Sequence, residues 1–135
     1  MTRWLVDGTN VVGSRPDGWW RDRPAAFARL VGRLATLVAR GDEVTVVFDG
    51  EAPADLAEGD HRGVAVRWAR RRGPDAADDR IVELVEADGG PSDLTVVTSD
   101  RALGERVEAL DAKIVVVGAG TLLRVLDELD ELDER

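Results

Sequence analysis

Aspartates occur at the ends of three expected strands and at the start of one expected helix. In an open parallel sheet, ligands bind beyond the carboxyl ends of the strands, so side chains at those positions can converge on one site. Several carboxylates held close together repel one another, and a divalent cation that prefers oxygen ligands relieves that repulsion. The residues concerned are Asp7, Asp49 and Asp100 after the strands, and Asp75, Asp78 and Asp79 at the helix start.

The composition of the chain narrows the choice of metal. The sequence has no cysteine, and His61 is its single histidine, so zinc is disfavoured. Mg²⁺ or Mn²⁺ is the expected cofactor, because both ions favour carboxylate oxygen as a ligand. A site of this kind can activate a water molecule and hold a phosphodiester on one or two metal ions.

Each aspartate also has a structural explanation when it is taken alone. Aspartate is common in turns and at helix N-caps. Asp75 in particular fits the N-cap of the helix that it precedes, and Asp79 would strengthen the first turn through the helix dipole. The acidic segments taken together favour function, because each borders a hydrophobic element at the same expected edge of the sheet.

Hydrophobic runs and helical periodicities alternate along the chain and predict the scaffold that positions the aspartates. Residues 7–23 and 51–62 are polar or rich in Gly and Pro, and we expect them to be irregular. Asp22 and Pro24 fit a helix start, and Gly41 fits the end of that helix. The expected strands are 4–6, 44–48, 64–66, 94–97 and 114–117, and the expected helices follow Asp22, Asp75, Asp100 and Gly120.

This alternation predicts a three-layer α/β/α fold with a central, mainly parallel sheet. A length of 135 residues and a hydrophobic content of 44% suit a single domain, residues 1–135, with an acidic helix end from about residue 126. Asp7 comes too early for a secretory signal, and no apolar run reaches membrane-spanning length. We therefore expect a cytoplasmic protein without a membrane partner. Leucines that continue to Leu132 leave a homodimer contact open.

The charge of the chain is acidic overall but unevenly distributed. The net charge of −9 and pI near 4.6 argue against a general nucleic-acid binder, which is usually basic. Lys113 is the only lysine, so nearly all the cations are arginines, which suit bidentate contacts with phosphate. The arginines cluster at Arg15, Arg21 and Arg23, and again at Arg67, Arg70, Arg71 and Arg72.

Four segments of the chain resemble the NYN domains of the PIN-like nuclease superfamily, and most closely the YacP-like branch. The resemblance runs in the same order over essentially the whole chain. It implies a doubly wound PIN-like fold and a metal-dependent ribonuclease site. The segments are 6–12 (Val-Asp-Gly-Thr-Asn-Val-Val), 47–50 (Val-Phe-Asp-Gly), 77–81 (Ala-Asp-Asp-Arg-Ile) and 97–101 (Val-Thr-Ser-Asp-Arg).

The resemblance also implies roles for individual residues. Catalytic roles pass to Asp7, Asp78 and Asp100, with Asn10 and Ser99 orienting ligands or metal-bound water. The same three aspartates would hold the metal, supplemented by Asp49 or Asp79. Asp79 is an extra acid beside Asp78, and the sequence leaves open which of the two is the better ligand.

The expected RNA-binding residues surround this site in the sequence. Exposed aromatic side chains can stack on unpaired bases, although Trp19 and Trp20 could instead cover the start of the first helix. Arginines near the acidic edge can grip phosphates. The full set is Arg15, Trp19, Trp20, Arg70, Arg71, Arg72 and Arg101.

Two functions remain open at this point. The first is a metal-dependent ribonuclease, active on single-stranded or structured RNA, either alone or with a ribosome or another RNA-linked partner. The alternative is an RNA-binding PIN-like domain with little or no cleavage activity of its own. The sequence does not separate these two functions. They differ in their need for metal, because a binder would hold RNA without a metal ion whereas the nuclease should need Mg²⁺ or Mn²⁺.

Overall fold

The computed structural model describes residues 1–69 and 72–133, which form one six-stranded sheet in the order β3-β4-β2-β1-β5-β6. All neighbouring strands are parallel except β3 and β4, which pair antiparallel. The strands are β1 (Arg3–Asp7), β2 (Glu43–Phe48), β3 (Gly59–His61), β4 (Val64–Trp68), β5 (Leu94–Val97) and β6 (Val115–Val117).

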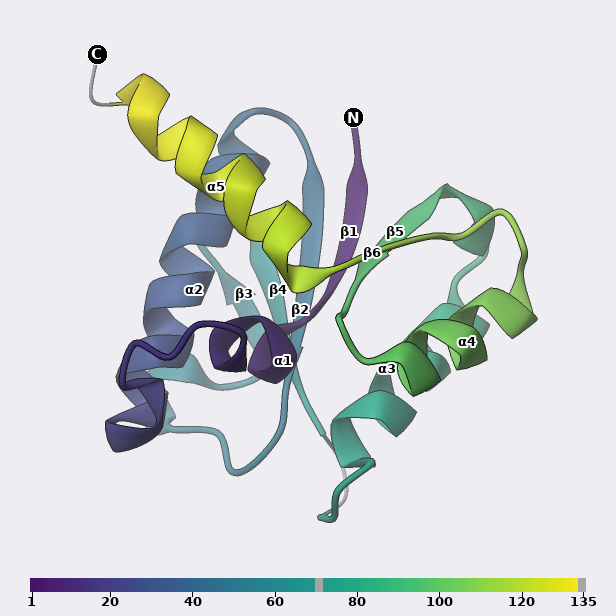
Figure 1. Ribbon diagram of the computed structural model, residues 1–135, viewed down its shortest axis with the longest axis horizontal. Coiled ribbons are helices and arrows are strands. Elements are labelled where there is room, and N and C mark those ends of the chain that lie inside the picture. Colours follow the sequence, from purple (N-terminus) through teal and green to yellow (C-terminus); the bar gives the residue numbers. More distant parts are fainter. Residues whose placement is uncertain (70–71, 134–135) are drawn as a thin grey trace.

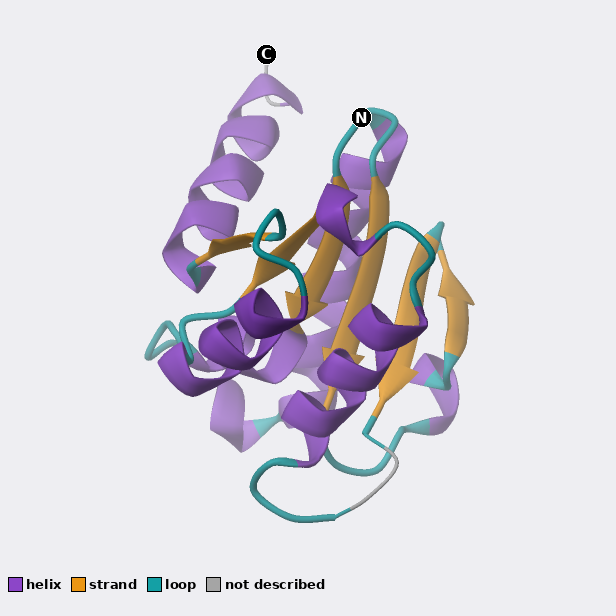
Figure 2. Cartoon of the chain, turned by 90° about the vertical axis from the view of Figure 1, so that its right-hand side faces the viewer, coloured by secondary structure: helices purple, strands orange, loops and turns teal. Residues whose placement is uncertain are grey.

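Helices cover both faces of this sheet (Figures 1 and 2). One face packs against α1, α2 and α5, and the other against α3 and α4. The three-layer α/β/α architecture expected from the sequence is therefore confirmed. The helices are α1 (Gly8–Gly13), α2 (Arg23–Ala39), α3 (Ala76–Ala87), α4 (Arg101–Leu110) and α5 (Ala119–Asp133).

The central strands are apolar on both sides because both sides are covered. In β1, Trp4 and Val6 pack with the first helical layer, whereas Leu5 packs with the second. Val46 and Val47 divide in the same way in β2, and each is fully buried. Continuous apolar runs are typical of strands in parallel sheets, and these runs are what made the strands predictable.

The expectation that residues 7–23 are irregular is wrong in part. It contains α1 and a single 3₁₀ turn at Trp19–Arg21. A Cβ on Gly8 would lie 2.5 Å from the Phe48 ring, so only glycine lets this helix start so close to the sheet. Val11 then anchors the helix in the core. Gly-Thr-Asn has low helix propensity, so burial rather than propensity selects the helix here.

The expectation that residues 51–62 are irregular is also wrong in part. It contains a 3₁₀ turn at Ala54–Leu56 and the edge strand β3. Arg62 and Gly63 turn the chain from β3 into β4, with φ angles of 55° and 86°. Two successive residues with positive φ favour a tight hairpin, but Arg-Gly is a weaker turn signal than Asn-Gly.

Aspartates begin two of the helices as side-chain caps. The Asp22 carboxylate accepts a hydrogen bond from the Ala25 N–H, and Pro24 stands in the first turn of α2, as expected. Asp100 caps α4 in the same manner. Asp75 occupies the expected N-cap position of α3, but its side chain makes no capping hydrogen bond.

None of the helices within the described ranges combines the length and the apolar character needed to cross a membrane.

The buried carboxylate of Asp42 ties together the edge of the sheet opposite the strand ends that carry the acidic residues. It accepts hydrogen bonds from the Thr2 backbone N–H, the Trp4 indole N–H and the Arg40 guanidinium, at 3.0, 3.0 and 2.8 Å. Burial alone would raise the pKa of Asp42, but these hydrogen bonds outweigh it and lower the pKa. The ionised form is therefore the one that stabilises the fold.

We predict that Asp42→Asn destabilises the protein by roughly 2–3 kcal/mol at pH 7, since an amide cannot satisfy all three donors. The Asp42 pKa is lowered in the folded state, so its contribution is present above the unfolded-state pKa. The difference between wild type and variant should shrink as the pH falls below about 4. Urea unfolding between pH 3 and 8 tests this, with the exposed Asp93→Asn as the matched control. Equal stabilities at pH 7 would contradict it.

Candidate active site

Asp7 lies at the carboxyl end of β1 with its side chain almost fully buried. Its Oδ2 accepts a hydrogen bond of 2.9 Å from the Thr98 hydroxyl. The same hydroxyl oxygen accepts a hydrogen bond of 3.1 Å from the Asp100 backbone N–H. Parallel pairing of β1 with β5 brings the two strand ends together, with Val6 opposite Val97. Thr98 therefore links the first and third of the predicted strand-end acids.

The surroundings of Asp7 raise its pKa to about 6. Burial is the largest cause, and the charges of Asp78 and Asp100 add to it. The Thr98 hydroxyl and the Asn10 backbone N–H act in the opposite direction. The charges of two carboxylates from distant parts of the chain therefore act on Asp7 at this edge of the sheet.

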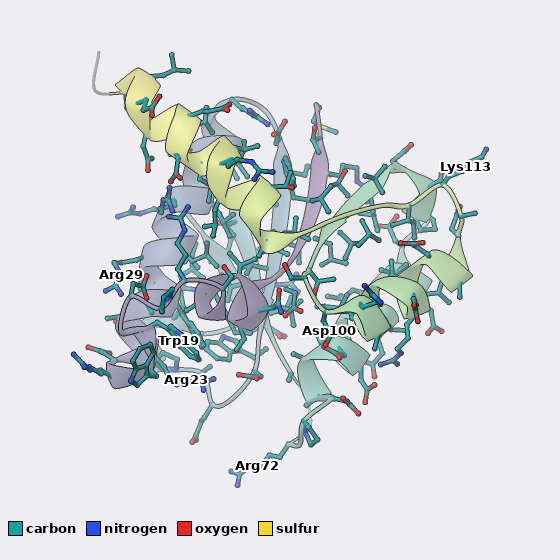
Figure 3. All side chains as sticks on the ribbon, in the orientation of Figure 1. Trp19, Arg23, Arg29, Arg72, Asp100 and Lys113 are labelled. Atoms are coloured by element: carbon teal, nitrogen blue, oxygen red, sulfur yellow. The ribbon has the colours of Figure 1, made fainter. Side chains whose placement is uncertain are left out.

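Asp78 and Asp100 reach this environment from two adjoining helices. Asp78 lies half-buried in the first turn of α3, which packs against α4. Burial raises the pKa of Asp78, and the charges of Asp100 and Asp75 raise it further, whereas Arg106 lowers it. Asp100, labelled in Figure 3, stands at the start of α4. Its Oδ1 accepts a hydrogen bond of 3.2 Å from the Leu103 backbone N–H. The α4 cap thus fixes one Asp100 oxygen.

Asn10 and Ser99 connect the elements around the acids. The Asn10 Oδ1 accepts a hydrogen bond of 2.8 Å from the Ser99 backbone N–H. The Ser99 hydroxyl oxygen accepts one of 2.9 Å from the Ala119 backbone N–H, at the start of α5. These bonds join α1, the end of β5 and α5. Both predicted residues lie beside the acids, and their hydrogen bonds within the fold are to backbone groups.

Asp49 and Asp79 differ from the other three acids because each is paired with an arginine. Asp49 accepts a hydrogen bond of 2.7 Å from Arg23 and one of 3.2 Å from the Thr9 hydroxyl. Asp79 accepts one of 3.1 Å from Arg106. Neither is among the charges that raise the pKa of Asp7. In each acid the arginine engages Oδ1, which lowers the net negative charge available for the predicted role as a supplementary metal ligand.

The donor set fits a hard divalent cation by its chemistry, since Asp7, Asp78 and Asp100 offer only oxygen. Within residues 1–69 and 72–133, no three His, Cys, Asp or Glu side chains lie close enough to enclose a metal ion. Mg²⁺ commonly keeps several of its waters and binds through one or two carboxylates together with substrate phosphates. The arrangement therefore suits a hydrated ion held at Asp7 better than a closed protein cage.

Trp19 and Trp20 differ in exposure, and the sequence left open whether they cover the first long helix or face RNA bases. Trp19 is half-buried, packs beside Gly13 and lines a hollow with Val11 and Leu30, so it covers the start of α2. Trp20 is 54% exposed and meets Trp19 edge-on. Of these two tryptophans, Trp20 is the one whose ring is exposed enough to stack on an unpaired base.

The arginines predicted to bind RNA also differ from one another. Arg15 pairs with Asp127 on α5, whereas Arg72 and Arg101 are exposed near the acidic edge. The predictions for Arg70 and Arg71 fall outside the described residues.

The sequence analysis did not assign roles to Thr98 and Arg23. Thr98 lies within one of the four segments that resemble the family, but the resemblance gives this residue no role. Its hydrogen bonds become visible only when β1 and β5 are paired. Arg23 lies between two rings, 5.4 Å from the centroid of Trp19 and 5.4 Å from that of Phe27, while it also pairs with Asp49. No short sequence pattern predicts that contact.

A family model described as the YacP-like NYN domain matches residues 4–131. The chain belongs to this family. Two solved structures of Rae1 (YacP) from Bacillus subtilis are similar over the whole chain. A mutant form gives a TM-score of 0.77 at 26% identity over 80% of that chain, and the other gives 0.75 at 28% over 79%. Comparison with curated proteins finds no match.

The family match confirms the resemblance drawn from the four sequence segments. The Rae1 structures confirm the PIN-like fold, since their likeness covers every layer of the α/β/α architecture. The YacP-like NYN domains lie in a nuclease-like superfamily, which agrees in kind with an acidic site at the carboxyl edge of the sheet.

We predict that Asp7→Asn stabilises the metal-free protein at pH 8 by on the order of 2–3 kcal/mol. The folded-state pKa of about 6 lies above the reference value of 3.8, so the ionised carboxylate destabilises the fold. This penalty is complete above about pH 6 and disappears as the pH falls below about 4. Thermal unfolding in EDTA across this range measures the gain, with Asp93→Asn as the control. A variant less stable than wild type at pH 8 would contradict the electrostatic account.

Proposed function

We propose that this protein is a metal-dependent ribonuclease that hydrolyses RNA phosphodiester bonds at Asp7, Asp78 and Asp100. One observation supports the proposal: these carboxylates come from β1, α3 and the start of α4, and the charges of Asp78 and Asp100 act on Asp7 at the carboxyl edge of a parallel sheet. Membership of the YacP-like NYN family supports a nuclease-type activity at that edge.

The proposed chemistry assigns separate tasks to the cation and the chain. Bound Mg²⁺ or Mn²⁺ would polarise the phosphoryl group and lower the pKa of a coordinated water. Asp7 would hold the cation, because its burial and its hydrogen bond from Thr98 fix its position. Asp78 forms no ion pair with any described residue, so its charge is available to the cation.

RNA is the proposed substrate, and single-stranded RNA is favoured by an exposed aromatic ring and by exposed arginines. Trp20 presents an exposed ring, and ring stacking suits unpaired bases. Arg72 and Arg101 are exposed near the same edge and can contact phosphates. The net charge of −9 would confine RNA binding to this local region of positive charge.

An RNA-binding domain with little cleavage activity is the second candidate. The observation that favours it is the spacing of the acids. Among the described residues, no three His, Cys, Asp or Glu side chains lie close enough together to hold a metal ion. A binder of this kind would hold RNA with an affinity that is independent of metal. The nuclease would cleave RNA only with Mg²⁺ or Mn²⁺ present.

We predict that Asp78→Asn lowers Mn²⁺-dependent cleavage of a labelled single-stranded RNA by roughly a hundredfold or more. Asp79→Asn should lower it by less than about tenfold, because the Asp79 carboxylate is already paired with Arg106. The two variants form a matched pair, since they remove the same charge from adjacent positions of one helix turn. Equal losses would show that both acids serve the metal. Full activity of Asp78→Asn, or cleavage in EDTA, would overturn the assignment.

A further inference from the structure

A cleft of about 850 Å³ lies beside the acidic site, and of the residues that line it the function proposed above uses Arg72 alone. It is bounded by the start of α2, the loop after β2, the end of β4 and the start of α3. Pockets of 300–1,000 Å³ accommodate ligands of nucleotide size. The cleft is therefore large enough for one nucleotide unit of an RNA chain.

The floor of the cleft is apolar and rigid. Phe27 and Trp68 line it, and both belong to an aromatic cluster with Phe48. Phe27 stacks on Phe48 at 4.4 Å between centroids, and Phe48 lies 5.3 Å from Trp68. Each lining ring exposes less than a tenth of its surface, and Phe27 lies between Phe48 and the Arg23 guanidinium, so the rings close the floor and only a small part of Trp68 is open to the cleft.

The rim of the cleft carries two arginines of different character. Arg23 is already held in place by its contacts with Trp19, Phe27 and Asp49. A guanidinium fixed in this way loses little entropy when it binds a phosphate. Arg72 is exposed on the other side of the cleft and makes no hydrogen bond or ion pair with any described residue. Figure 3 shows Arg23 beside Trp19, and Arg72 at the far end of the molecule from Lys113.

Two carboxylates on the same rim limit how a ligand can lie. Asp49 and Glu51 line the cleft, and both would repel a phosphate placed against them. A carboxylate accepts hydrogen bonds, so it suits ribose hydroxyls and base amino groups. A ligand with one anionic end, one flat apolar part and several hydrogen-bond donors matches this arrangement, and a nucleotide has all three.

The first turn of α3 contributes a residue to the cleft and an acid to the proposed active site. Ala76 lines the cleft, and Asp78 stands two residues later in the first turn of α3. Both sites lie beyond the carboxyl ends of neighbouring parallel strands. An RNA chain with one nucleotide in the cleft would therefore bring an adjoining phosphodiester towards Asp7.

We infer that this cleft is a subsite for one unpaired nucleotide of the RNA, next to the bond that is cleaved. The inference rests on the proposed ribonuclease function. The base lies against the floor of the cleft beside Trp68, a phosphate contacts Arg72 and Arg23, and the acids of the rim face sugar or base donors. The subsite contributes binding rather than chemistry.

The experiment measures binding of a fluorescein-labelled, 10-nucleotide single-stranded RNA in EDTA by anisotropy. Arg72→Ala should raise Kd by about three- to tenfold, and Arg72→Glu should raise it further. The controls are Lys113→Ala and Lys113→Glu, which make the same charge changes at an exposed position far from the cleft. With Mn²⁺, Arg72→Ala should raise KM and leave kcat unchanged, because it removes an interaction made equally before and during the reaction.

A second measurement locates the RNA without relying on affinity. The same RNA carrying 4-thiouridine should cross-link, on irradiation, to peptides that contain Glu51 or Trp68. Cross-links found only elsewhere, or Arg72 variants that bind like wild type, would overturn the subsite while leaving Mn²⁺-dependent cleavage intact. Binding that depends on Arg72, with cleft cross-links but no cleavage, would support the subsite and overturn the nuclease. Wild-type protein that binds no RNA would overturn both.

Discussion

The site depends on the burial of the Asp7 carboxylate at the end of β1. A buried carboxylate without a cation is costly, and two further acids nearby increase that cost. The Thr98 hydroxyl offsets part of it, and the pairing of β1 with β5 is what places Thr98 within reach. Sheet pairing therefore fixes the position of the Asp7 carboxylate. Its burial and the two nearby negative charges disfavour its ionised form, so a bound cation would stabilise that form.

Arginine pairing separates the acids of this edge into two groups. Asp49 and Asp79 each form an ion pair with an arginine, whereas Asp7 forms none with any described residue. The pair of Arg23 with Asp49 also holds the arginine between two rings at the mouth of the cleft. The same ion pair thereby lowers the net charge of Asp49 and holds the Arg23 guanidinium where it could contact a phosphate.

The sequence predicts the sheet well because the central strands are continuous apolar runs, as in β2 and β5. It predicts the convergence of Asp7, Asp78 and Asp100 because parallel strands end at one edge. Helix α1 was missed because its start depends on a close approach of Gly8 to Phe48, which is a tertiary contact. The pairing of Asp49 with Arg23 was missed for the same reason, since the partners are 26 residues apart. Local patterns identified the acids, but only the fold shows which of them are already paired.

Binding of Mn²⁺ in the absence of RNA tests the central claim that the unpaired acids hold a cation. Electron paramagnetic resonance measures free Mn²⁺ directly, so affinity can be compared between wild type, Asp7→Asn and Asp79→Asn. The account predicts that wild type and Asp79→Asn bind with similar affinity, and that Asp7→Asn binds at least about tenfold more weakly. Equal Mn²⁺ affinity for wild type and Asp7→Asn would contradict it.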